Sequence, residues 1–332
     1  MKKLNPWLPI VAAVLVLLAA CTKKPAEKSA YTIAVVPQGT THEYWKSIHA
    51  GAMKAVQDLA QQGVNVNVIW KGPLREDDRE QQVQVVEAFV SQGVDGIVLA
   101  PFDKDALVRP VQEAKQVGIA TVVVDSPLNS NDPIAVIATN NHHGGELAAE
   151  RLASLLGGKG KVMLLRYQEG VASTEARERG FIEKMKSGFP NIQVISSDQY
   201  AGATRDTAKS AAENMLNRYG DDLQGIFTPN ESSTVGTLLA IDDLHRSGKI
   251  KLVGFDSSDA LIGALKANKL QGLVVQNPFR MGELGIKTIV ASLRKQSFES
   301  RVDTGETLIT PDNMDQQDAQ RLLRPPLQQY LK

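Results

Sequence analysis

After Ala30 the chain alternates short runs of apolar residues with longer segments in which apolar positions recur every three or four residues. The short runs are typical of buried strands, and the longer spacing is typical of helices that pack through one face. The first half predicts strands at 31–36, 64–70, 96–100, 120–124 and 134–138, and helices at 42–61, 76–91 and 104–116. The second half predicts a similar alternation, with strands at 161–166, 192–197, 225–228 and 251–255 and helices at 145–156, 173–186, 204–218 and 232–246. Two series of similar length predict two lobes of the same topology.

Some of the expected strands are apolar at successive positions rather than at every second one. Ile97-Val98-Leu99-Ala100 and Val122-Val123-Val124 are the clearest cases. A strand of this kind is covered on both faces, as in a parallel sheet with helices on either side. Gly63, Gly93 and Gly118 each follow an expected helix, at the point where a left-handed residue ends it. The sequence therefore predicts an α/β protein with two similar Rossmann-like lobes, each built on a parallel sheet.

The first twenty residues differ from the rest of the chain. Two lysines precede an unbroken apolar run of eleven residues, 10–20, which fits a secretory signal better than a membrane span. Leu18-Ala19-Ala20-Cys21 ends this run and resembles the lipobox of bacterial lipoproteins. By that resemblance residues 1–20 are a lipoprotein signal peptide, Cys21 carries lipid, and residues 21–30 are a flexible tether. The alternative is an uncleaved N-terminal anchor, and both interpretations place the protein at a membrane, in the periplasm or at the cell surface.

Composition and charge disfavour some classes of function. The chain carries 37 basic and 37 acidic residues, and no basic patch indicates nucleic acid as a partner. Cys21 is the only cysteine, so the two lobes contain no disulfide and depend on their hydrophobic cores. A transcriptional repressor of the same fold is disfavoured, because the chain begins with a signal rather than a helix-turn-helix.

Polar side chains follow several expected strands at the point where each strand ends. These residues are Asp125, Asn230 with the adjacent Glu231, Asp256 and Gln276. In an open parallel sheet the carboxyl ends of the strands face the ligand crevice. A strand-end Asp or Asn can instead cap the next helix, and for any one residue this is the more common role. Four such positions together indicate a site.

The loop after the first strand adds His42, Tyr44 and Trp45 at the same edge of the sheet. The two large rings form either one wall of a small-molecule site or part of the core, and their position alone leaves both open. Among the polar groups, carboxylates only accept hydrogen bonds, whereas amides both donate and accept. Such a mixed set suits a polyhydroxylated ligand, in which each hydroxyl also donates and accepts.

Three stretches resemble the type I periplasmic binding proteins, and most closely the sugar-binding proteins of ribose-like ABC importers. They are Gly93-Val94-Asp95-Gly96-Ile97-Val98-Leu99-Ala100-Pro101, Ala172-Ser173-Thr174-Glu175-Ala176-Arg177-Glu178-Arg179-Gly180-Phe181 and Val253-Gly254-Phe255-Asp256. The resemblance implies two lobes joined by three hinge strands, with the ligand held between them. The N-terminal lobe would comprise residues 31–138 plus 277–302, and the C-terminal lobe and tail residues 139–276 plus 303–332. The hinges are expected near residues 139–140, 276–277 and 302–303.

The same resemblance assigns roles to individual residues. Tyr44 and Trp45 match the aromatic pair that packs on the sugar ring, and His42 takes a position that is often Asn. The positions whose side chains bond the sugar are matched by Gln38, Asp125, Arg177, Asn230, Asp256 and Gln276. The chain departs from the ribose pattern at Ala100, Ser126 and Ala203, where Asn, Arg and an aromatic residue are usual. We therefore expect a ligand that is larger than ribose or differently hydroxylated.

The expected function is lipid-anchored capture of a sugar or polyol and its delivery to an ABC permease, by a monomer without cofactor or metal. The alternative is a sensor that presents its ligand to a membrane receptor. Asp125 and Asp256 could form a glycosidase pair, but Arg177 nearby favours ionised carboxylates that bind rather than catalyse. His142-His143 lacks the neighbouring ligands of a metal site, and Gly157-Gly158-Lys159-Gly160-Lys161 lacks the spacing of a phosphate loop.

Overall fold

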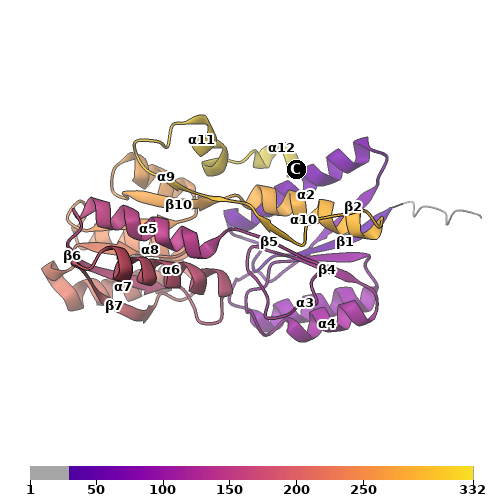
Figure 1. Cartoon of the computed structure of the whole chain (residues 1–332), viewed down its shortest axis with the longest axis horizontal. Coiled ribbons are helices and arrows are strands. Elements are labelled where there is room, and N and C mark those ends of the chain that lie inside the picture. The colour runs from indigo at the N-terminus through magenta and orange to yellow at the C-terminus, as the bar shows by residue number, and fades with distance from the viewer. Residues whose placement is uncertain (1–29, 332) are drawn as a thin grey trace, which may run out of the picture.

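The computed structural model describes residues 30–331 and shows two α/β lobes side by side along the long axis of the molecule (Figure 1). The expected signal peptide, Cys21 and the tether as far as residue 29 lie outside the described residues. Each lobe contains a six-stranded sheet with helices on both faces. Over the described residues, no helix has both the length and the apolar character needed to cross a bilayer.

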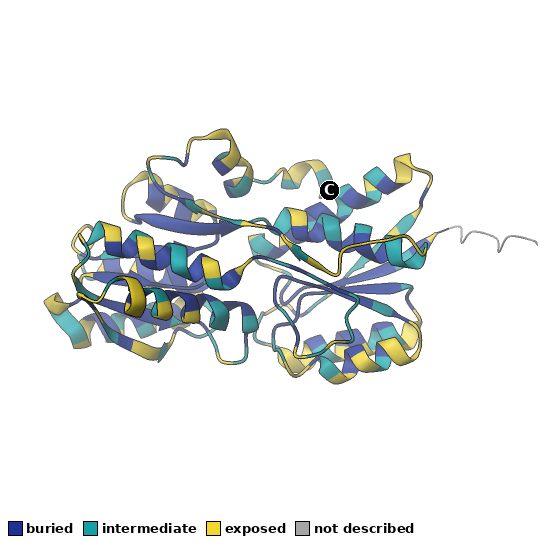
Figure 2. Ribbon diagram, in the orientation of Figure 1, coloured by how far each residue is buried: buried dark blue, intermediate teal, exposed yellow. Residues whose placement is uncertain are grey.

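The N-terminal lobe is built on a sheet of order β11-β5-β4-β3-β1-β2, in which all neighbouring strands run parallel. Its strands are β1 (Tyr31–Val36), β2 (Val66–Trp70), β3 (Gly96–Leu99), β4 (Ala120–Val124), β5 (Ala135–Ala138) and β11 (Arg301–Asp303). Helices α2 (Glu43–Gln61) and α10 (Pro278–Leu293) cover one face, and α3 (Arg79–Gln92) and α4 (Val108–Gln116) cover the other. Successive residues of β3 enter opposite cores, since Ile97 packs with α3 and α4 whereas Val98 packs with α2 and α10. The unbroken apolar runs are therefore strands buried on both faces (Figure 2).

The C-terminal lobe repeats this arrangement in the order β12-β10-β9-β8-β6-β7. Its strands are β6 (Gly160–Arg166), β7 (Ile192–Tyr200), β8 (Gly225–Phe227), β9 (Lys251–Phe255), β10 (Gly272–Gln276) and β12 (Glu306–Ile309). One face carries α5 (Asn141–Leu155) and α6 (Ala172–Gly188), and the other carries α7 (Arg205–Tyr219), α8 (Glu231–Asp243), α9 (Asp259–Lys266) and α11 (Gln317–Leu323). A short 3-10 helix, η1 (Gly220–Asp222), follows α7. The β10–β12 pair is antiparallel, unlike the expected parallel sheet, because β10 runs toward the hinge and β12 away from it.

Three segments connect the lobes. β5 continues into α5 through residues 139–140 and β10 into α10 through Asn277, at the two positions predicted. The third crossing is at Thr304-Gly305 rather than 302–303, because Asp303 still pairs with Ala138 in the first sheet. The final helix α12 (Leu327–Tyr330) packs against α2, so the tail returns from the second lobe to the first.

Most expected elements are present, and their ends differ from the prediction by a few residues. The helix predicted at 104–116 begins only at Val108. The segment before it is held in a turn, because Asp103 Oδ1 accepts from the backbone N–H groups of Asp105 and Ala106 at 2.8 and 2.9 Å. The expected left-handed helix ends are confirmed, with φ values of 77°, 67° and 83° at Gly63, Gly93 and Gly118.

Candidate ligand-binding site

One cavity between the lobes is lined by side chains from both of them. The N-terminal lobe contributes the loop after β1 and the residue after β4, and the C-terminal lobe contributes α6 and the ends of β8, β9 and β10. All nine side chains that the sequence singled out line it: Gln38, His42, Tyr44, Trp45, Asp125, Arg177, Asn230, Asp256 and Gln276. The carboxyl ends of parallel strands from two sheets thus meet at this cavity.

Asp125 and Asp256 occupy equivalent places in the two lobes. Each directly follows the third strand from one edge of its sheet, β4 or β9, and each has a φ of 66°. This left-handed backbone is uncommon for residues with a Cβ, but Asp and Asn tolerate it. Both carboxylates line the cavity, and the two residues are only 4% and 7% exposed. The same backbone feature therefore places one buried acid on each side of the site.

Arg177 is held from three directions. Its Nε donates to Asn141 Oδ1 and its Nη1 donates to Pro229 O, each at 2.8 Å. Its guanidinium carbon lies 3.9 Å from the centroid of the Phe255 ring. The turn of α6 that carries it fits closely against α5, where a Cβ on Gly145 would lie 1.9 Å from the Arg177 carbonyl oxygen. Arg177 is thus a fixed buried cation.

The two acids respond to burial in the same way. Burial raises the pKa of Asp125 to about 6, although the charge of Arg177 and a hydrogen bond from Tyr44 hold it down. Burial also raises the pKa of Asp256, against the charge of Arg177 and a hydrogen bond of 2.7 Å from Gln276 Nε2. Both carboxylates are therefore costly to keep ionised, and each additional hydrogen-bond donor lowers that cost.

Tyr44 and Trp45 belong to both the core and the cavity wall. The Tyr44 hydroxyl donates to Asp125 Oδ1 at 2.5 Å, and Trp45 Nε1 donates to Glu76 Oε1 at 2.7 Å. The two rings meet edge to face with their centroids 4.9 Å apart. Trp45 is 3% exposed and packs in the same core cluster as Ile48. The core interpretation therefore applies to these rings, which also line the cavity, and a role as the wall of a small-molecule site stays a prediction.

Of the three amide side chains that line the cavity, one caps a helix and the other two do not. Asn230 Oδ1 accepts from Ser233 N–H at 3.2 Å and caps α8, so the capping role applies to this residue. Gln38 Nε2 donates to Pro101 O at 2.9 Å. Within residues 30–331, Gln276 Oε1 is buried without a hydrogen-bond partner. A buried acceptor of this kind gains free energy from a ligand hydroxyl.

Six lining residues were not identified from the sequence: Glu76, Tyr167, Val171, Ser173, Thr174 and Ser232. Tyr167 directly follows β6, so the strand-end rule that found Asp125 could also have found it. Glu231, which the sequence placed with Asn230 after the same strand, also lines the cavity. Glu76 was predicted as the first residue of the helix at 76–91, but α3 begins only at Arg79 and Glu76 lies in the loop before it, where no strand end marks it.

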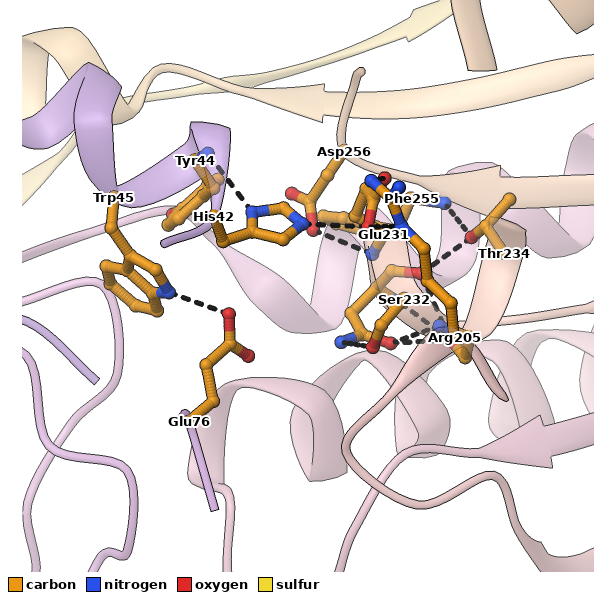
Figure 3. Close-up of polar contacts among 12 residues, drawn as sticks. His42, Tyr44, Trp45, Glu76, Arg205, Glu231, Ser232, Thr234, Phe255 and Asp256 are labelled. Atoms are coloured by element: carbon orange, nitrogen blue, oxygen red, sulfur yellow. Dashed lines mark hydrogen bonds and ion pairs between the residues drawn. The ribbon is translucent and has the colours of Figure 1, made fainter. Parts of the chain in front are cut away.

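His42 and Glu231 join the two lobes at one side of the cavity. His42 Nε2 lies 2.7 Å from Glu231 Oε2, and Arg205 Nη2 donates to the other carboxylate oxygen at 2.5 Å (Figure 3). Burial acts to lower the pKa of His42, but the hydrogen bond and charge of Glu231 outweigh it and raise this pKa to about 8. Burial acts to raise the pKa of Glu231, but His42 and Arg205 lower it to about 2. The contact is therefore an ion pair at neutral pH that holds the lobes in a closed arrangement.

Ligand affinity is expected to be highest between about pH 6 and about pH 8. Protonated His42 stabilises the closed lobes, fully below its ordinary pKa of 6.5, and this contribution is lost as the pH rises through about 8. A ligand hydroxyl that donates to Asp125 needs the ionised carboxylate, so affinity falls as the pH drops below about 6. Calorimetric titration across roughly pH 5 to 9 measures both the loss of affinity at acid pH and the loss at alkaline pH.

Two variants separate these two pH effects. His42→Gln should abolish the loss of affinity at alkaline pH and keep the loss at acid pH. Asp125→Asn should abolish the loss at acid pH and keep the loss at alkaline pH. The stability of the ligand-free protein depends on pH in a different way from ligand affinity. Protonated Asp125 stabilises the folded protein at acid pH, and this contribution is lost as the pH rises through about 6. A flat affinity profile in the unmodified protein would contradict both assignments.

The His pair and the Gly-Lys segment lie outside this cavity. His142 Nε2 is 2.9 Å from Glu183 Oε2, and His143 Nδ1 is 2.5 Å from Glu306 Oε1, so each ring has its own acidic partner. Over the described part of the chain, no three His, Cys, Asp or Glu side chains are grouped to hold a metal ion. Residues 157–159 connect α5 to β6 and do not precede a helix.

Fold and site together define a class of protein: two similar α/β lobes joined by three crossings, with a polar cavity that both lobes complete. A family model described as a periplasmic binding protein domain matches residues 33–297. The chain belongs to the periplasmic binding protein family. It is of the type I, sugar-binding class that serves ABC importers outside the cytoplasm, and this class binds substrates rather than converting them.

Three comparisons support this assignment. The chain is 30% identical over 290 residues to the ribose import binding protein of Bacillus subtilis (strain 168), covering 83% of this chain and 88% of that protein. A carbohydrate transporter solute binding protein from Agrobacterium radiobacter, solved in complex with D-arabinose, is similar with a TM-score of 0.84 and 32% identity, covering 90% of this chain and 100% of that one. An ABC transporter solute binding protein from Agrobacterium vitis, bound with α-D-tagatopyranose, has a TM-score of 0.82 and 30% identity, covering 88% of this chain and 99% of that one.

Proposed function

We propose that this protein captures an uncharged sugar or polyol between its lobes and delivers it to the permease of an ABC importer. The observation that carries the proposal is a cavity to which both lobes contribute hydrogen-bonding side chains, including Gln276 Oε1, a buried acceptor that has no hydrogen-bond partner among residues 30–331. A ligand held there loses most of its exposure to water. Because neither lobe completes the site alone, the ligand stabilises the closed arrangement by differential contact.

The charges around the cavity favour an uncharged ligand. Its carboxylates come from Glu76, Asp125, Glu231 and Asp256, and its cations from Arg177 and His42. His42 is paired with Glu231, which leaves Arg177 beside the three remaining carboxylates. An acidic sugar would bring another negative charge into a site where carboxylates are already costly. Neutral hydroxyls, in contrast, can donate to these oxygens.

A thermal-shift screen tests this proposal. Neutral pentoses, hexoses and polyols should include compounds that raise the melting temperature, because a ligand that binds only the native state stabilises it. D-glucuronate and D-gluconate should give smaller shifts than D-glucose, their neutral parent. Calorimetry on the strongest hit then gives its affinity. A larger shift with the acids than with the neutral parent would overturn the proposed ligand class.

We infer, in addition, that Cys21 anchors the mature protein through a lipid. The apolar run, the Leu18–Cys21 match and the start of β1 at Tyr31 support this, since residues 21–30 then separate the lipid from the fold. In a bacterial host, the unmodified protein should fractionate with membranes and a Cys21→Ser variant should be soluble. A Cys21→Ser variant that stays with the membranes would favour the uncleaved anchor instead.

A further inference from the structure

Glu76 accepts one hydrogen bond from each lobe. Its carboxylate lines the cavity from the loop between β2 and α3. Its Oε1 accepts from Trp45 Nε1 at 2.7 Å, within the N-terminal lobe, as Figure 3 shows. Its Oε2 accepts from the Tyr167 hydroxyl at 3.0 Å, and Tyr167 follows β6 in the C-terminal lobe. One carboxylate therefore connects two aromatic side chains of the cavity wall.

The segment that begins at Tyr167 also contacts the N-terminal lobe directly through two further polar contacts. The Glu169 carbonyl accepts from Arg79 Nη2 at 2.7 Å. Lys104 Nζ lies 2.6 Å from Glu175 Oε2. Both contacts cross between the lobes and lie near the Glu76–Tyr167 bond in sequence. The hydrogen bond to Glu76 thus belongs to a direct lobe-to-lobe contact surface.

The Tyr167 ring is fixed by the same surface. Tyr167 is 2% exposed and meets the ring of Phe102 edge to face, with the centroids 6.5 Å apart. Val171 completes this small apolar cluster. Burial, with the charge of Glu76, raises the pKa of Tyr167 well above its ordinary value, so the hydroxyl remains a donor at neutral pH. The ring also lines the cavity and supplies aromatic surface to it from the C-terminal lobe.

We propose that Glu76 is a positioning residue that couples the placement of Trp45 to lobe closure, by accepting the Tyr167 hydroxyl only when the lobes are closed. With the lobes apart, Glu76 keeps its bond to Trp45 and loses its partner from the other lobe. The closed state is then favoured by a contact that requires no ligand atom. The proposal rests on the proposed function, because the two rings are walls of the same ligand cavity.

The test uses variants that each remove one partner of these two hydrogen bonds, and Tyr167→Phe and Glu76→Gln do so with almost no change in side-chain volume. Tyr167→Phe removes the donor from the second lobe, Trp45→Phe removes the donor from the first, and Glu76→Gln replaces the shared acceptor. Glu80→Gln is the matched control, since Glu80 is an exposed acid at the start of α3. Dyes on Glu87→Cys and Ser210→Cys, in a Cys21→Ser background, report lobe separation by energy transfer. Both dye positions are exposed, on α3 and α7 respectively.

The measured quantity is the ratio of closed to open protein, without ligand and with D-arabinose. Tyr167→Phe and Glu76→Gln should each lower this ratio about tenfold. The variant that carries both substitutions should lower the ratio by no more than either substitution alone, because both remove the same hydrogen bond. Trp45→Phe should lower it less, because its bond lies within one lobe. The melting temperature of the ligand-free protein should change little in Tyr167→Phe and Glu76→Gln, which separates positioning from a structural role, whereas Trp45→Phe lowers it because it leaves a cavity in the core. Ratios that match the Glu80→Gln control, or fully additive effects, would overturn the proposal.

The two proposals fail in different ways. If D-arabinose and the other neutral sugars do not bind, the proposed ligand class fails, while the ligand-free ratios still decide the role of Glu76. If sugars bind but Glu76→Gln leaves both the ratio and the sugar dissociation rate unchanged, the proposed function stands and the role of Glu76 is refuted.

Discussion

Replacement of Arg177 by methionine is expected to lower sugar affinity by about a hundredfold or more. Arg177 faces two buried acids and holds down the pKa of both Asp125 and Asp256. Methionine would keep much of the packing volume but remove the charge from beside them. It would also leave Asn141 Oδ1 and Pro229 O without the donors that they now have. Removal of one partner of a buried charged set typically costs about 3–5 kcal/mol.

Calorimetric titration with the best ligand from the thermal-shift screen measures this loss. The matched control is Arg179→Met, because Arg179 lies two residues further along α6 and is exposed. Circular dichroism of both variants establishes whether the lobes remain folded. If the folded Arg177→Met protein bound sugar as tightly as the Arg179→Met control, Arg177 would be a structural residue only.

The alternation of strands and helices was predictable because it depends on local pattern. β3 and β4 are short apolar runs, and residues such as Ile97 and Val98 bury both faces of the sheet. The acids at the ends of β4 and β9 were predictable for a related reason, since a parallel sheet presents its strand ends at one edge. Local pattern therefore gave the lobes and part of the site.

The remaining site residues depend on how the lobes face each other, which no local pattern encodes. Arg177 lies on a helix, and only the family resemblance indicated a role for it. Glu76 reaches the cavity from an irregular loop, and its two partners are 31 and 91 residues away in sequence. The His42–Glu231 ion pair spans 189 residues. Such contacts follow from the closed arrangement of the two lobes, not from periodicity.

Asp256→Asn is expected to lower sugar affinity roughly tenfold to hundredfold and, at the same time, to stabilise the ligand-free protein. Asp256 Oδ1 accepts from Gln276 Nε2 at 2.7 Å, and Oδ2 accepts from Glu231 N–H at 3.3 Å. Asparagine offers one acceptor in place of two and carries no charge, so a ligand hydroxyl loses its strongest partner, at a cost of about 1–3 kcal/mol. Asparagine is preferred to alanine because it tolerates the φ of 66° at this position.

The gain in stability follows from the direction of the pKa shift. Burial raises the pKa of Asp256, so the folded protein favours the protonated acid and loses stability as the pH rises through that pKa. Asparagine is neutral at every pH and removes this penalty. Thermal unfolding near neutral pH should therefore show a higher melting temperature for the variant without ligand, and a smaller increase when sugar is added. If Asp256 served a structural role, its replacement would lower the stability of the protein. If it is kept for binding at the expense of stability, its replacement raises the stability of the protein. The sign of the change in melting temperature therefore decides between the two roles.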